Sequence, residues 1–336
     1  GGKKTVTRAE LGSTIPNSAT VIKLARALEV EPSQLWLTDT DFTSTETQHL
    51  AFKRNTISYT VEQLLAINHP PGNLQIISGA GAGKTQILAQ KVCRLITVHG
   101  MRPKEIVVIT FTQRAAAENR ERLRKLYREE FNHERELDEL FVGTIHAWCL
   151  ELLQRHSPTY LSFDLLDGMQ QYLFIQRYYK HIFPDGGLYY KNKNGAVSLA
   201  NKSDTMRWAP KIFNLLREAR LDKSKITFGN AEESLKNYEA MLLQQHKLDF
   251  SALLCSVSNL LLSDFDFRLS VVNSLKYLII DEYQDTNHAQ ERIVQHLHQV
   301  SYGRIKLAVV GDDDQLIFGW NNALRENMLE FSARYP

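Results

Sequence analysis

The chain has 336 residues, 43% of them hydrophobic and 23% charged, as in ordinary globular proteins, and its length suggests two or three domains. Its net charge of +2 is too small to indicate nucleic-acid binding by general attraction, so any DNA contact must come from a local groove. Three widely spaced cysteines without a C-x-x-C pair argue against a zinc site or a disulfide framework and favour a cytoplasmic protein, and no apolar stretch is long enough to span a bilayer.

The first segment, residues 1–37, is predicted to form a small helical unit. Apolar residues recur at helical spacing after residue 20, and Pro32-Ser33 opens a second short helix. The run TRAELGSTIPNSATVIKLARALEVEPSQLW resembles the second half of a helix-turn-helix domain of the xenobiotic-response-element repressor type, which implies part of a DNA reader. A helical appendage that only packs on the main body fits the same pattern. Residues 38–49 are polar, as expected of a linker.

The main body is organised around Ile76–Thr85, IISGAGAGKT, where an apolar run ends in a glycine-rich loop and a helical pattern begins. Glycines let several backbone N–H groups point inward at an anion, and the start of the helix adds to the attraction. In such a phosphate loop Lys84 is predicted to reach the β- and γ-phosphates of a nucleotide, and Thr85 to bind Mg²⁺. Ser78 stands where the general pattern has a glycine. The predicted cradle comprises Ser78, Gly79, Ala80, Gly81, Ala82, Gly83, Lys84 and Thr85.

Short apolar runs bounded by polar residues predict five strands, each followed by a helical pattern. They lie near residues 74–77, 106–109, 141–144, 277–280 and 307–310. Runs that are continuous rather than alternating indicate a parallel sheet covered by helices on both faces, that is, an α/β fold. Residues 148–271 show an almost wholly helical pattern and are predicted to form an inserted helical domain, within which residues 186–204 are interpreted as a mobile loop.

Two carboxylates follow the predicted strand at residues 277–280, in the run YLIIDEYQDT. Asp281 at the strand end is suited to hold Mg²⁺ through its water shell, opposite Thr85. Glu282 is suited to polarise the attacking water. Acidic pairs are common on solvated loops, but a buried-type strand before this pair and a phosphate loop upstream favour a catalytic role.

A third polar cluster, LAVVGDDDQLIFGW, follows the predicted strand at residues 307–310. Gln315 is placed to sense the γ-phosphate at the sheet edge where doubly wound folds bind ligands. Phe318 and Trp320 lie just beyond and would stack on DNA bases. Taken alone, such aromatics are more often core residues.

Together with TFTQRAAAE and VGTIHAW, these motifs make residues 59–336 resemble a superfamily 1 DNA helicase of the UvrD/Rep type. That family accepts serine at the first position of the loop. The resemblance implies a RecA-like P-loop motor domain at residues 50–147 and 272–323, the helical insert at 148–271, and the start of a second motor domain at 324–336. It implies a parent enzyme that uses ATP and Mg²⁺ to move along single-stranded DNA, from 3′ to 5′, and to open duplex junctions.

The resemblance also implies roles for individual residues. Gln63 reads the adenine edge, Glu282 is the catalytic base, and Gln284 and Gln315 link the γ-phosphate to the DNA groove. Residues implied to touch DNA are Thr110, Phe111, Thr112, Thr144, His146, Phe318 and Trp320. For His146 a satisfied core histidine is the alternative.

Two departures from the family lower the positive charge near the nucleotide. Asn321 and Gln86 stand where arginines are usual in that family. Gln86 is nevertheless counted among the predicted nucleotide-binding residues, because it directly follows Thr85. Because most of a second motor domain and its arginines are missing, we expect this chain to be an N-terminal fragment that is poorly active alone. A DNA-bound, nucleotide-dependent switch with little unwinding activity is the alternative function, and a helicase–nuclease fusion is left open.

Overall fold

The computed structural model describes residues 59–336 except 80, 132–134, 192–195, 219–228 and 313–324. The chain divides into two compact units, Gly1–Ile57 and Ser58–Pro336, and all described residues belong to the second. The predicted helix-turn-helix segment and linker therefore lie outside the described residues. So do Ala80, Gln315, Phe318, Trp320 and Asn321.

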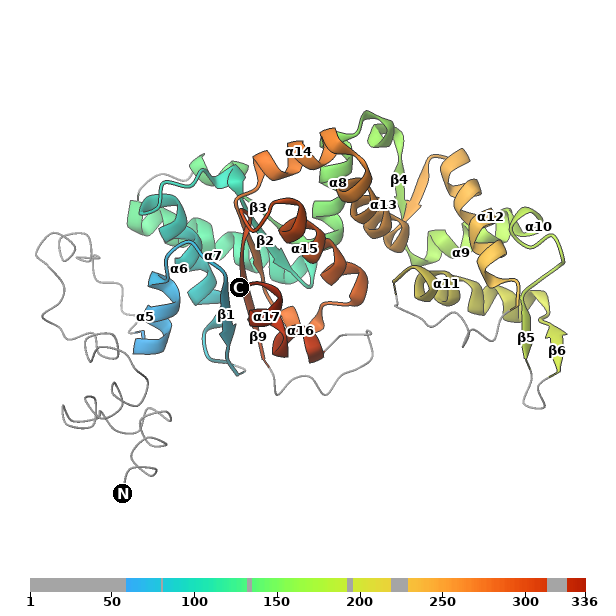
Figure 1. The fold of residues 1–336 in the computed structure, drawn as a ribbon, viewed down its shortest axis with the longest axis horizontal. Helices are drawn as coiled ribbons and strands as arrows, with labels where there is room; N and C mark the ends of the chain where they lie inside the picture. Colours follow the sequence, from blue (N-terminus) through green and yellow to red (C-terminus); the bar gives the residue numbers. More distant parts are fainter. Residues whose placement is uncertain (1–58, 80, 132–134, 192–195, 219–228, 313–324) are drawn as a thin grey trace, which may run out of the picture. The chain divides into compact units, whose positions relative to one another are not determined.

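A five-stranded parallel sheet forms the centre of the second unit (Figure 1). Its strands are β1 (Leu74–Ile77), β2 (Ile106–Thr110), β3 (Phe141–Thr144), β8 (Tyr277–Ile280) and β9 (Lys306–Gly311). They are ordered β1-β9-β8-β2-β3, and all neighbouring pairs run parallel. The five predicted strands and their parallel arrangement are confirmed, and the α/β fold is that of a RecA-like motor domain.

Both faces of the sheet are buried, which explains why its strands are continuously apolar. Ile106 and Val108 face one core, shared with α5 (Val61–Asn68), α6 (Lys84–Thr97) and α7 (Gln113–Phe131). Val107 and Ile109 face the other core. The helices of that second core are α8 (Ile145–His156), α13 (Phe250–Ser263), α14 (Phe265–Ser274), α15 (His288–Val300), α16 (Arg325–Leu329) and α17 (Phe331–Arg334).

The region predicted as an all-helical insert is mainly helical, but its described residues also form four short strands. Besides α13 and most of α8 and α14, its described helices are α9 (Gly168–Arg177), α10 (Tyr179–Ile182), α11 (Lys202–Glu218) and α12 (Ala231–Gln244). A parallel pair joins β4 (Asp164–Leu166) to β7 (Lys247–Asp249), and an antiparallel pair joins β5 (Tyr189–Lys191) to β6 (Val197–Leu199). The interpretation of residues 186–204 as a mobile loop is therefore wrong where β5 and β6 pair and where α11 begins.

A buried ion pair ties the insert together. Arg217 on α11 donates to both carboxylate oxygens of Asp249, at 2.9 and 2.8 Å, and both side chains are 3% exposed. Asp249 also accepts from Tyr238 and caps α13 through the backbone N–H of Ala252. The network satisfies a buried carboxylate that would otherwise be strongly destabilising. Because α13 also packs in the sheet's core, the insert and the sheet share a helix.

Within the described ranges no single helix is long and apolar enough to cross a membrane. Only α13 and α14 taken together reach that length and composition, and they are bent by 99° relative to one another.

Lys91 is a cation buried on α6, where it is 1% exposed and donates to the carbonyl oxygen of His69. Burial, with the nearby charge of Arg94, lowers the pKa of Lys91 to about 8. Below that pH the native state carries a buried charge that destabilises it. Stability should rise as pH increases from about 8 towards the ordinary lysine pKa near 10.4, because the native lysine loses its proton before the unfolded one does. We predict that Lys91→Met raises the free energy of unfolding by about 1–3 kcal/mol at neutral pH.

Urea unfolding of the wild type and of Lys91→Met, at pH values below and above the lowered pKa of Lys91, measures this difference in the free energy of unfolding. The advantage of the methionine variant should shrink as pH rises, because the wild-type lysine becomes neutral. A variant less stable than wild type at neutral pH would show that the buried ammonium is stabilising.

Candidate nucleotide and DNA site

The phosphate loop leaves the end of β1 and is held there by the neighbouring strand. The backbone N–H of Ser78 donates to the carbonyl of Gly311 at the end of β9, at 3.0 Å. Gly81 and Gly83 have φ of 77° and 80°, a left-handed conformation that favours glycine. The carbonyl of Gly83 then accepts from the N–H groups of Gln86 and Ile87, which begins α6. The strand–loop–helix geometry predicted for this stretch is confirmed.

The loop is open where an anion would sit. Of the atoms of the described residues, none would lie within 4 Å of a Cβ built on Gly79 or Gly81. The hydroxyl oxygen of Ser78 and the Nζ of Lys84 are buried and have no hydrogen-bond partner among the described residues. Unsatisfied buried donors are costly and call for acceptor atoms, and phosphate oxygens supply them.

Two predicted nucleotide residues flank the loop. Gln63, on α5, donates from Nε2 to the carbonyl of Ala82 at 3.0 Å, so its side chain touches the loop directly. Gln86 donates to the hydroxyl of Tyr59 at 3.0 Å and accepts from Nη1 of Arg122 at 3.4 Å. A guanidinium from α7 thus lies beside the glutamine that occupies the usual arginine position.

Lys84 lies among acidic groups from two other strand ends. Its Nζ is 3.5 Å from Oε2 of Glu282, after β8, and 3.7 Å from Oδ2 of Asp312, after β9. Gln284 connects the two sides, donating to Glu282 at 2.7 Å and accepting from the backbone N–H of Asp312 at 3.1 Å. Because β1, β9 and β8 are adjacent, the three strand ends meet at one edge of the sheet.

Asp281 is fixed at the end of β8. Its backbone N–H donates to the carbonyl of Ile109 at 2.9 Å, and its Oδ1 accepts from the N–H of Glu282 at 3.1 Å. Burial and the charge of Glu282 raise the pKa of Asp281 to about 6, while a hydrogen bond from the buried Asn119 side chain on α7 favours the ionised form. A carboxylate in this setting is suited to a cation.

The arrangement fits Mg²⁺ held jointly with a nucleotide. In the described part of the chain no three His, Cys, Asp or Glu side chains form a metal cage of their own. Mg²⁺ is commonly bound by one or two protein oxygens together with substrate phosphates and water. Asp281 and Thr85, in the first turn of α6, are the side chains that would hold it.

Glu282 adopts a left-handed backbone, with φ of 52° and ψ of 46°. For a residue other than glycine this conformation costs about 1–2 kcal/mol. It directs the chain into the 3₁₀ turn η5 (Tyr283–Asp285) and leaves the Glu282 carboxylate partly exposed, at 35%. A strained, partly exposed carboxylate beside an open phosphate loop is a candidate general base.

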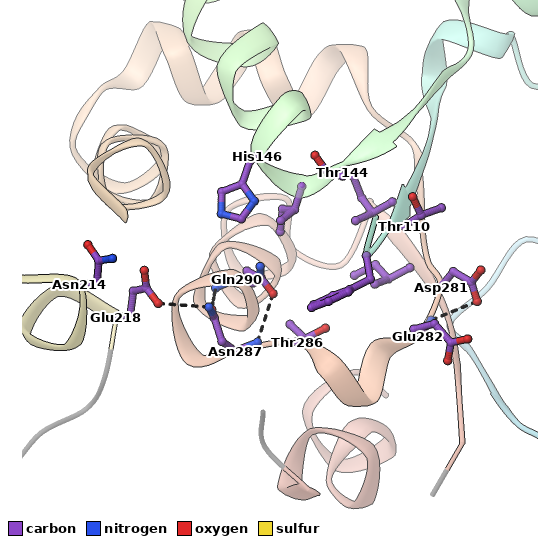
Figure 2. Close-up of a pocket in the computed structure, with 14 residues that line it drawn as sticks. Thr110, Thr144, His146, Asn214, Glu218, Asp281, Glu282, Thr286, Asn287 and Gln290 are labelled. Atoms are coloured by element: carbon purple, nitrogen blue, oxygen red, sulfur yellow. Dashed lines mark hydrogen bonds between the residues drawn. The ribbon is translucent and has the colours of Figure 1, made fainter. Parts of the chain in front are cut away.

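A pocket of about 290 Å³ adjoins these carboxylates (Figure 2). The predicted DNA residues Thr110, Phe111, Thr144 and His146 line it together with Asp281 and Glu282. Thr112 is not among the lining residues; its hydroxyl instead caps α7 through the N–H of Ala115 at 3.0 Å. Sequence reasoning missed the lining side chains Asn214, Glu218, Thr286, Asn287 and Gln290.

The pocket reaches from the sheet edge to the insert. Glu218, at the end of α11, accepts from Nδ2 of Asn287 at 3.3 Å, and Figure 2 shows this bond beside the Gln290 side chain. Nothing in the local sequence places α11 opposite α15, so no sequence pattern could have indicated Glu218 as a site residue. For Asp312 there was such a pattern, because this residue begins the acidic run after β9.

The surroundings of His146 in this pocket favour the neutral form of its ring. Burial lowers its pKa to about 4, and its ring packs edge-on against Phe250 with centroids 5.0 Å apart. We predict that His146→Asn leaves the salt dependence of single-stranded DNA affinity unchanged, because no counterion is released at a neutral group. Fluorescence anisotropy of a labelled oligothymidine across a salt series measures the slope. If the substitution changed the slope of log K against log salt concentration by about one, the histidine would be charged when DNA binds.

The sequence of this chain is similar to those of known proteins. Residues 59–336 match the family described as "UvrD/REP helicase N-terminal domain". The chain is 32% identical over 282 residues to the ATP-dependent DNA helicase PcrA of Leuconostoc citreum, covering 82% of this chain and 35% of that protein. It is 31% identical over 290 residues to the ATP-dependent DNA helicase SRS2 of Saccharomyces cerevisiae, covering 78% and 23%. The chain thus spans about a third of PcrA and a quarter of SRS2.

Proposed function

Since the chain belongs to the UvrD/REP helicase family, we propose that it is the nucleotide- and DNA-binding part of a cytoplasmic ATP-dependent DNA helicase. The proposed parent protein moves along single-stranded DNA from 3′ to 5′ and separates duplex at junctions. The direction rests on the family resemblance.

One observation supports the proposal most directly. Glu282 forms an ion pair with Lys84, and together with Asp281 it lines the pocket that holds Thr110, Thr144 and His146. A nucleotide on one side of these carboxylates and a DNA strand on the other would therefore contact the same turn. When two ligands shift the conformational equilibrium of the same segment, each changes the affinity of the other by the same factor.

The side chains suit phosphoryl transfer to water. The loop N–H groups and Lys84 would hold the phosphates, and Gln63, whose side chain contacts the loop, would meet the base. Mg²⁺, held by Thr85 and Asp281, would neutralise charge on the transferring phosphate. Glu282 would orient and deprotonate the attacking water. A nucleotide-dependent switch needs no such base, so the position of Glu282 favours hydrolysis.

Binding measurements on the full chain test this proposal. We expect a labelled oligothymidine to bind more tightly than duplex, and its affinity to change at least about threefold when a non-hydrolysable ATP analogue and Mg²⁺ are added. The analogue's affinity should change by the same factor when DNA is added. Equal binding of duplex and single strand, or no mutual effect, would reject the proposal. Strand displacement from 3′-tailed and 5′-tailed duplexes tests the direction.

A further inference from the structure

Glu291, on α15, is a buried carboxylate outside the predicted nucleotide and DNA sites. It is 2% exposed and accepts hydrogen bonds from four side chains. The hydroxyl of Tyr283 donates to Oε2 at 2.6 Å, and that of Tyr335 donates to Oε1 at 2.7 Å. Arg334 and Gln295 donate to the same Oε1 at 3.1 Å each. One carboxylate thus joins the turn after β8, α15 and the end of α17.

Through Tyr283 this carboxylate reaches the proposed catalytic base. Tyr283 directly follows Glu282, whose backbone is left-handed. The Tyr283 ring is fully buried and packs edge-on against Phe331 of α17, with centroids 5.9 Å apart. A strained backbone persists only where its surroundings hold it. With both ring and hydroxyl fixed, the Glu282 backbone has no freedom to relax.

The same turn is packed against residues 325–335 at further points. Asn327 donates to the carbonyl of Thr286 at 3.1 Å and accepts from Arg334 at 3.0 Å. Gly311 fits between Gln284 and Met328 so closely that a Cβ there would lie 2.8 Å from one side chain and 2.7 Å from the other. Close packing on several sides makes the turn and the α16–α17 segment move together.

We propose that Glu291 is a positioning residue: its carboxylate holds Tyr283, and thereby the Glu282 backbone, in place and couples that turn to α17. The catalytic part of this inference, that Glu291 positions the base, rests on the proposed function, because it takes Glu282 as the base. The mechanical part, that Glu291 couples the turn to α17, does not depend on the proposed function. Glu291 itself lies away from the phosphate loop and does not need to touch nucleotide.

Amide hydrogen exchange tests the mechanical part in the full chain. The Asp285 and Thr286 amides close the turn by donating to Glu282 and Tyr283. We expect Glu291→Leu to speed their exchange at least about tenfold, together with the amides of α17. Tyr335→Phe, which removes one distant hydroxyl, should speed the same turn amides about threefold or more. Glu291→Gln should restore much of the protection.

A matched control is Glu330→Gln, which removes a 52%-exposed carboxylate bound to the same Arg334 and should leave the turn unchanged. Faster exchange confined to α17 in Tyr335→Phe would overturn the coupling. If Glu291→Leu does not fold, Tyr335→Phe and Tyr283→Phe decide the question alone.

Kinetics test the catalytic part. In Tyr335→Phe and Tyr283→Phe we expect kcat for ATP to fall at least about fivefold while Kd for Mg·ATP stays within about twofold. An equal loss in binding, or an unchanged kcat with a loosened turn, would refute the positioning role. If the wild-type chain turns ATP over too slowly for these rates to be compared, as expected of a poorly active fragment, the exchange experiment decides the coupling, and the mutual effect of nucleotide and DNA on binding decides the proposed function.

Discussion

In the complete parent protein, replacing Glu282 by glutamine should lower ATP turnover by about 10²–10⁴-fold without weakening nucleotide binding. The isosteric amide keeps the volume and the hydrogen bond from Gln284 but cannot accept a proton from water. It also removes a negative charge 3.5 Å from the Nζ of Lys84, close to where phosphates would bind. Mg·ATP should therefore bind as tightly as in wild type or more tightly. Phosphate release from labelled ATP with oligothymidine present, and titration with a fluorescent nucleotide, measure the two quantities.

Glu118→Gln is the matched control, because Glu118 is a 61%-exposed carboxylate on α7 whose ion-pair partner in the described part of the chain is Arg114. Turnover by Glu282→Gln equal to that of this control would remove Glu282 from the mechanism. Loss of nucleotide binding would instead show that Glu282 supports the fold of the loop. The result also separates the enzyme from the alternative switch, whose nucleotide response would survive the substitution.

The strands were predictable because a buried parallel sheet needs continuous apolar runs. Residues 277–280 and residues 106–110 are buried on both faces of the sheet, so each strand could be recognised from its own apolar run. The functional residues at their ends were predictable because ligand chemistry requires particular groups there: glycines at Gly81 and Gly83, a cation at Lys84, carboxylates at Asp281 and Glu282. That these groups meet follows from the parallel direction of the strands.

Pairings between distant segments could not be predicted from local pattern. Strand β4 pairs with β7 some eighty residues later, and each has only three residues. The β5–β6 hairpin lies among glycine, asparagine and lysine, which favour loops, and it gains support from Tyr190 packing on Trp208 at 5.5 Å. The roles of Glu218 and Glu291 likewise depend on which helices become neighbours.

Lys84→Ala should have the second large effect, lowering Mg·ATP affinity by about 10²–10³-fold. The side chain of Lys84 is 9% exposed and makes ion pairs with Glu282 and Asp312, yet within the described part of the chain its ammonium forms no hydrogen bond. Its donors are therefore available to phosphate oxygens, and one or two charge-assisted bonds account for about 3–4 kcal/mol.

The same substitution should also affect the protein without nucleotide. Asp312 is 2% exposed, and losing the nearby cation should lower the free energy of unfolding by about 1–3 kcal/mol. Thermal unfolding with and without Mg·ATP measures both effects: wild type should gain stability as ligand exceeds Kd, and the variant should gain none at the same concentration. Lys104→Ala, at an exposed lysine after α6, is the control. If Lys84→Ala kept the full ligand-induced stabilisation, the phosphates would have to bind elsewhere, and the shared role of the Asp281–Glu282 turn would lose its basis.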